Sequence, residues 1–139
     1  MGHNIRWDND EKTVVFQEYD ENPSKDDLYD LARKSAEMLG TVEHTVHLII
    51  DERNVSHILD TKDMAYLEKL TPRNQGAVLV IVQGRKIGYK MMIQRLAKSV
   101  GPTAFAQGYF VETLEQARTV LQESYGVRYA SGWVEETLS

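Results

Sequence analysis

The chain of 139 residues contains no cysteine, only three prolines and no long apolar run. The absence of cysteine excludes disulfides, thiolate metal sites and thiol nucleophiles, and it leads us to expect a cytoplasmic protein. The longest uninterrupted apolar run covers residues 77–82, far below the ~20 residues that a membrane-spanning helix needs. The length suits one domain and can bury a core without a disulfide or a metal.

Acidic residues are also absent from one long stretch of the chain. Residues 72–100 carry six basic and no acidic side chains, whereas residues 1–30 carry nine acidic and three basic ones. The net charge of -5 therefore hides a dipolar distribution, which could favour pairing with an acidic partner or with a second copy of the chain. Nucleic acid is disfavoured, because the whole chain is acidic and no aromatic residues interleave with the basic ones.

Periodicity and turn residues predict five strands and four helices. The predicted strands span 5–8, 12–19, 45–50, 77–82 and 109–111, and the predicted helices span 24–39, 60–70, 86–100 and 114–125. Strands that alternate with helices predict an α/β fold with a mixed, mostly parallel sheet and helices packed on it. The order is β-β-α-β-α-β-α-β-α, and the N-terminal hairpin supplies an antiparallel edge strand.

Caps and chain ends complete the predicted organisation. Ser24 and Thr113 are expected to cap helices, and Gly40 is expected to end a helix in the left-handed conformation. Residues 1–126 are predicted to form a single domain, followed by a C-terminal tail over 127–139. Trp133 beside Val134 suggests that this tail docks on a surface.

The order of elements over roughly residues 5–125 resembles the STAS superfamily, which includes SpoIIAA-like proteins. The best local stretch is residues 48–61, in which an apolar strand ends at Asp51, a short loop follows, and a helix begins near Asp60 and Thr61. In the anti-sigma factor antagonists of that superfamily, the equivalent helix begins with Asp-Ser-Ser-Gly, and its second serine accepts a phosphate. Here residues 62–64, Lys-Asp-Met, replace the glycine and small residues, so the chain looks more like the SpoIIAA-like branch of bacterial proteins without an assigned role.

The resemblance implies a hydroxyl near the start of this helix as a phosphate acceptor. Aligned from Asp51 without a gap, Thr61 falls on the acceptor position and Asp60 on the serine before it. With one inserted residue, Asp60 matches the aspartate of the motif and Thr61 its first serine. A phosphate at a helix start gains from unpaired N–H groups, although Asp60 or Thr61 acting simply as the cap is the commoner arrangement.

Five further residues are candidates for contact with an anion or a protein partner. They lie in the loop after the third predicted strand and in the turn and helix after the fourth: Arg53, His57, Arg85, Lys86 and Lys90. A strand-to-helix turn is where α/β sheets bind phosphates, but the glycine spacings of the Walker A and dinucleotide motifs are absent. A solvated basic face is the alternative interpretation of the same pattern.

Metal and catalytic motifs are missing. His44 and His47 are expected on opposite faces of a strand, and His57 in a loop, so we predict neither a metal site nor a cofactor. No Gly-x-Ser-x-Gly elbow or thiol nucleophile is present, and the paired acids occur at a helix start and in the tail. The sequence therefore favours a protein that is not an enzyme.

The sequence favours a non-enzymatic SpoIIAA-like binding or regulatory module that acts through protein contacts, with a protein partner or a second copy of itself. The first alternative is a binder of a small apolar or anionic ligand, such as a lipid. That ligand would lie between the sheet and helices that carry Met38, Met64, Met91 and Met92. A phosphorylation switch at Thr61 is the weaker alternative.

Overall fold

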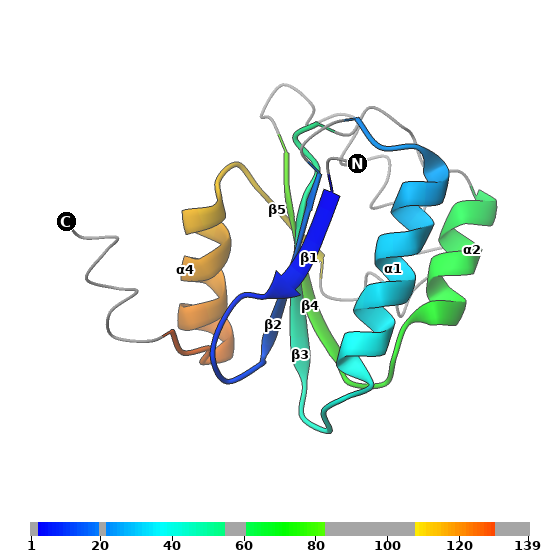
Figure 1. Ribbon diagram of the computed structural model, residues 1–139. Helices are drawn as coiled ribbons and strands as arrows, with labels where there is room; N and C mark the ends of the chain where they lie inside the picture. Colours follow the sequence, from blue (N-terminus) through cyan, green and yellow to red (C-terminus); the bar gives the residue numbers. More distant parts are fainter. Residues whose placement is uncertain (1–2, 20–21, 55–60, 83–107, 130–139) are drawn as a thin grey trace.

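The computed structural model describes residues 3–19, 22–54, 61–82 and 108–129. Within these ranges the chain forms five strands and three helices (Figure 1). The elements are β1 (His3–Trp7), β2 (Val14–Tyr19), α1 (Lys25–Leu39), β3 (Val46–Asp51), α2 (Thr61–Leu70), β4 (Gln75–Ile81), β5 (Gly108–Val111) and α4 (Leu114–Tyr125). The predicted α/β class is confirmed, and the helix predicted over residues 86–100 lies outside the described ranges.

The strands form one mixed sheet in the order β1-β2-β3-β4-β5. Strand β1 pairs antiparallel with β2, and the pairs β2–β3, β3–β4 and β4–β5 are parallel. The prediction of an antiparallel hairpin strand at the sheet edge is therefore confirmed. Because β2, β3 and β4 run in the same direction, their carboxyl ends meet at one end of the sheet.

Helices cover both faces of the sheet (Figure 1), with α1 and α2 on one face and α4 on the other. On the α4 face, Phe16, Ile49 and Leu79 pack with Leu121, and on the α1 face the buried set includes Val15 and Leu48. Burial on both faces explains why these strands contain runs of consecutive apolar residues.

The first and last described helices begin with the predicted caps. The side chain of Ser24 accepts a hydrogen bond from the Asp27 N–H, and the Asp27 carboxylate accepts one from the Ser24 N–H. The Ser24 N–H lowers the pKa of Asp27 from its ordinary value, because it stabilises the ionised carboxylate. Thr113 accepts from the Gln116 N–H in the same way at the start of α4.

The prediction that Gly40 is left-handed is wrong. Its backbone has φ -67° and ψ -15°, because the chain continues the right-handed turn beyond α1. The N–H groups of Thr41 and Val42 donate to the carbonyl oxygens of Met38 and Leu39, so no reversal of the backbone is needed. Gly126, after α4, does take the left-handed conformation, with φ 67°.

Packing against the domain continues past the predicted boundary at residue 126. The Val127 N–H donates to the Leu121 carbonyl oxygen, which closes α4, and the Val127 side chain is buried in the core of the α4 face. Tyr129 packs against the same core. Trp133 and the rest of the predicted tail lie outside the described residues.

In the ranges that the structure describes, no helix is long and apolar enough to span a membrane.

Candidate functional site

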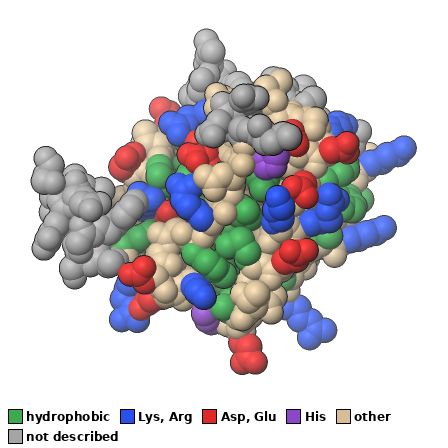
Figure 2. Space-filling model, in the orientation of Figure 1, with side chains coloured by type: hydrophobic (Ala, Val, Ile, Leu, Met, Phe, Trp, Pro, Cys, Tyr) green, Lys and Arg blue, Asp and Glu red, His purple; other side chains and the backbone are tan. Residues whose placement is uncertain are grey.

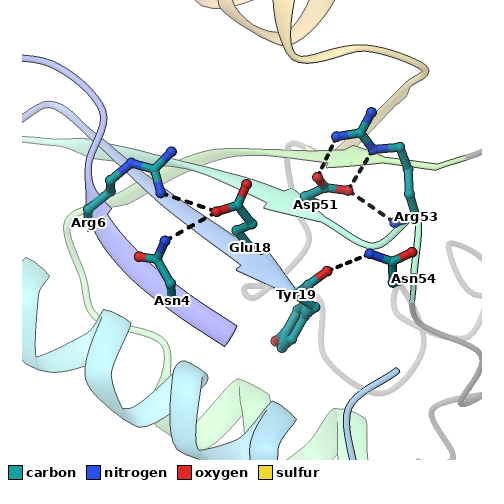
Figure 3. Close-up of polar contacts among 7 residues, drawn as sticks. All are labelled: Asn4, Arg6, Glu18, Tyr19, Asp51, Arg53 and Asn54. Carbon is teal, nitrogen blue, oxygen red and sulfur yellow. Dashed lines mark hydrogen bonds and ion pairs between the residues drawn. The ribbon is translucent and has the colours of Figure 1, made fainter. Parts of the chain in front are cut away.

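The candidate site lies at the carboxyl end of β3, where the apolar strand ends at a charged pair. Asp51 is buried, and the guanidinium of Arg53 folds back onto it (Figure 3). Arg53 Nε lies 2.9 Å from Asp51 Oδ1, and Nη2 lies 2.6 Å from Oδ2. The Arg53 backbone N–H also donates to Oδ1, at 3.1 Å, so the carboxylate fixes both the turn and the side chain.

This pairing controls the electrostatics of Arg53. The hydrogen bonds that the guanidinium donates to Asp51 raise its pKa above the ordinary value, and the negative charges of Asp51, Glu115 and Glu18 add to the effect. The Arg53 side chain is nevertheless 47% exposed. In the described part of the chain, no group accepts a hydrogen bond from Nη1, so this atom can donate to a ligand or a partner.

A second charged pair lies beside the first on the neighbouring strands. Glu18 of β2 is in register with Asp51 on one side and with Asn4 of β1 on the other. Glu18 Oε1 accepts hydrogen bonds from Asn4 Nδ2 at 3.2 Å and from Arg6 Nη1 at 3.4 Å (Figure 3). Two carboxylates on adjacent strands are thus each neutralised by their own arginine, which avoids repulsion between them.

The arginine of this second pair is also held by an aromatic ring. The guanidinium carbon of Arg6 lies 4.7 Å from the centre of the Phe16 ring, within the range of a cation–π contact. The Arg6 side chain is 47% exposed. Arg6 and Arg53 therefore present two oriented cations at this end of the sheet.

The turn after β3 is tied to the end of β2. Asn54 Nδ2 donates to the Tyr19 carbonyl oxygen at 2.8 Å (Figure 3). Burial raises the pKa of the Tyr19 phenol well above its ordinary value, with smaller contributions from Glu52 and Asp27. Tyr19 is therefore a neutral core residue, and the Asn54 bond holds residues 51–54 in a fixed conformation.

The structure describes only two of the seven candidate residues. Arg53 follows β3 at its carboxyl end, and Thr61 is the exposed first residue of α2. Helix α2 begins at this same end of the sheet (Figure 1). The others lie outside the described ranges: His57, Asp60, Arg85, Lys86 and Lys90. Thr61 takes a position common to many residues at helix starts, so it adds no support of its own for a phosphorylation switch.

Sequence reasoning missed the residues that orient Arg53. The sequence predicts that the strand ends at Asp51, but it does not predict that the Asp51 carboxylate holds the Arg53 side chain in place. An Asp followed two residues later by Arg at a strand end is a local signal that could have identified the pair. Glu18 and Arg6 could not be found in this way, because their position beside Asp51 depends on the strand register.

Two other polar clusters join elements to one another. Arg118 of α4 forms a bidentate pair with Asp8, at 2.7 and 3.1 Å, and Tyr129 Oη donates to the same carboxylate at 2.7 Å. On the other face, the buried Asp63 of α2 is contacted by Lys25 Nζ at 3.1 Å and by the Tyr29 hydroxyl. Each cluster docks a helix and neutralises a buried carboxylate.

His47, Met38 and Met64 pack in or against the core, whereas His44 is exposed. His47 is buried, as predicted, and His44 Nε2 bonds to the Lys12 carbonyl oxygen at 2.7 Å. Met64 is fully buried, and Met38 packs half-buried against the core, whereas Met91 and Met92 lie outside the described residues. Among the residues described, no group of three His, Cys, Asp or Glu side chains could hold a metal ion.

Comparisons of the chain with protein-family models, with curated proteins and with solved structures found no match. The chemistry of the site therefore rests on its own geometry. The described edge carries oriented cations next to neutralised carboxylates, an arrangement that suits the recognition of charged groups on a partner.

Proposed function

We propose that this protein is a non-enzymatic SpoIIAA-like binding or regulatory module. It contacts a protein partner through the carboxyl end of strands β2 and β3, a surface called here the carboxyl edge of the sheet. The observation that carries the proposal is the clamped guanidinium of Arg53. A side chain that is already fixed loses little conformational freedom on binding, so its hydrogen bonds contribute more of their energy to affinity.

The chemistry of the edge supports a partner that offers an acceptor group. Nη1 of Arg53 points away from the bonds to Asp51, and a carboxylate or a backbone carbonyl would meet it. The half-exposed Arg6 adds a second donor group on the same edge.

A substitution of Arg53 tests this proposal. The partner would first be captured from an extract of the cells that make the protein and then purified for binding measurements. We expect Arg53→Ala to weaken binding by about tenfold, which corresponds to about 1.4 kcal/mol. The measurement is a titration by isothermal calorimetry.

Arg128→Ala is the matched control, because it removes the same charge from an exposed site. Arg128 is 79% exposed and pairs with Glu11, away from the β3 edge. If Arg53→Ala binds as tightly as the wild type while circular dichroism shows it folded, the carboxyl edge is not the contact surface. If both variants weaken binding equally, net charge rather than the clamped arginine explains the effect.

A further inference from the structure

On its outer side, β1 pairs with no strand among the residues that the structure describes. The Asp8 N–H donates to the Val14 carbonyl oxygen, so Asp8 directs its backbone groups toward β2. In an antiparallel pair, alternate residues point their N–H and C=O groups to the same side. The backbone groups of His3, Ile5 and Trp7 therefore point away from the sheet, and no described strand pairs with them.

Half-buried apolar side chains line this edge. Ile5 and Trp7 of β1 pack against the core of the α1 face, together with Met38 and Val42 at the end of α1, and all four stay partly exposed. Figure 2 shows apolar side chains gathered in the middle of the face on which Figure 1 places β1 in front. An edge strand with adjacent apolar surface is a template for pairing with another strand.

The charges of α1 beside this edge are self-complementary. His3 of β1 lies 4.0 Å from Asp27 and 3.9 Å from Asp30, which shows that this side of α1 overhangs the edge strand. Lys34 follows on the same side one turn later, with Nζ 3.0 Å from Asp30. Asp27 and Asp30 precede Lys34 on this side and Glu37 follows it, so two antiparallel copies centred between positions 30 and 34 would place Lys34 of each near Asp30 of the other.

We propose that β1 pairs with β1 of a second copy of this chain, antiparallel and about a two-fold axis at Ile5. In this register Ile5 faces Ile5 of the second copy, and His3 faces its Trp7. His3, Ile5 and Trp7 of one copy then each face a residue of the other copy whose backbone groups also point outward. Each of these residue pairs exchanges two backbone hydrogen bonds. The two five-stranded sheets become one continuous sheet, with the α1 helices side by side.

The pairing uses the outward backbone groups of His3, Ile5 and Trp7, whereas the partner contact is centred on Arg53 after β3, and Arg6 of β1 is the residue that the two surfaces share. A second copy fits better than an unrelated extended peptide, because the register, the apolar edge and the charges of α1 are all self-complementary. An isologous contact of this kind is also the commonest form of dimer.

A charge-swap experiment at Ile5 tests the register directly. Ile5→Lys places like charges at the two-fold axis, and so does Ile5→Glu, so we expect each variant to sediment as a monomer where the wild type is a dimer. Mixing the two variants, with one of them labelled with nitrogen-15, should restore a dimer that contains one copy of each by native mass spectrometry. This rescue is expected only if residue 5 of one copy lies next to residue 5 of the other, because only then can the opposite charges of the two variants meet.

Val111→Lys is the control, because Val111 is also half-buried but lies on β5, the opposite edge strand. It should remain a dimer. A wild-type chain that is monomeric at every concentration overturns the proposal, as does an Ile5→Lys variant that stays dimeric.

Hydrogen exchange on the wild type keeps the proposal testable if the Ile5 variants do not fold. The amides of His3, Ile5 and Trp7 should exchange more slowly as the protein concentration rises. Rapid exchange at all concentrations would contradict self-pairing. Protection of these amides only when a different protein binds would assign the edge to that protein instead.

Discussion

At the scale of single residues, His47 occupies a position in the sheet that a backbone carbonyl normally fills. The β3–β4 register shifts between Val46 and Leu48, and the Ala77 N–H donates to His47 Nδ1 at 2.9 Å. A Cβ on Gly76 would lie 2.5 Å from Nδ1, so glycine is required beside the ring. The imidazole therefore accepts the hydrogen bond of a backbone N–H at the irregularity between β3 and β4. It can accept this bond only while Nδ1 is unprotonated.

This bond makes the stability of the fold depend on pH. Burial lowers the pKa of His47 below its ordinary value of 6.5, so the unfolded chain binds a proton more readily than the folded one. The stability that neutral His47 contributes is complete above pH 6.5 and is lost as the pH falls below it. We expect the urea concentration at the unfolding midpoint to decrease as the pH is lowered from about 8 to about 5.5. The decrease should be smaller in His47→Gln.

His44→Gln is the control for this measurement. His44 is exposed and lies before β3, and its Nε2 donates to the Lys12 carbonyl oxygen outside the β3–β4 ladder. The dependence on pH in His44→Gln should therefore match that of the wild type. A His47→Gln variant with an unchanged dependence would show that His47 does not titrate on unfolding.

At the scale of secondary structure, a buried ion pair docks α4 on the N-terminal hairpin. The Arg118 side chain is 10% exposed and the Asp8 side chain 2% exposed. Burial, the charge of Asp8 and its hydrogen bond raise the pKa of Tyr129, which therefore stays a neutral donor. The carboxylate is thus satisfied by groups from α4 and from the segment after it.

Removal of Arg118 should leave a buried carboxylate without its cation. We expect Arg118→Ala to lower the free energy of unfolding by about 3–5 kcal/mol, the usual effect of breaking one side of a buried pair. Arg128→Ala, which removes an exposed partner of Glu11, should change it by less than about 1 kcal/mol. Urea denaturation measures both changes in the free energy of unfolding. Equal changes would mean that the buried Arg118–Asp8 pair stabilises the fold no more than the exposed Arg128–Glu11 pair.

Local signals predicted the strands and helices that the structure describes, because the causes of these elements are local. The cap at Ser24 and the apolar strand that ends at Asp51 follow from residues a few positions apart. Gly40 was mispredicted because the conformation after α1 depends on where the chain goes next, which one glycine does not specify. Arg118 and Asp8 are 110 positions apart, so no local pattern could pair them.

At the scale of the whole molecule, the sheet brings distant segments to one edge. Residues 4–6, 18–19 and 51–54 come from three strands, and only their register places them together (Figure 3). The α/β class and the antiparallel edge strand could be predicted from the order of elements alone. The polar contacts of the candidate site could not, because a shift of one residue would turn each side chain to the other face.

The central claim is that the carboxyl edge at Arg53 contacts a protein partner. Hydrogen exchange of the full chain, alone and with the captured and purified partner, tests it most directly. We expect slower exchange at residues 51–54 and at the end of β2 when the partner is bound. Protection confined to other segments, such as the last turn of α4, with residues 51–54 unchanged would contradict the claim.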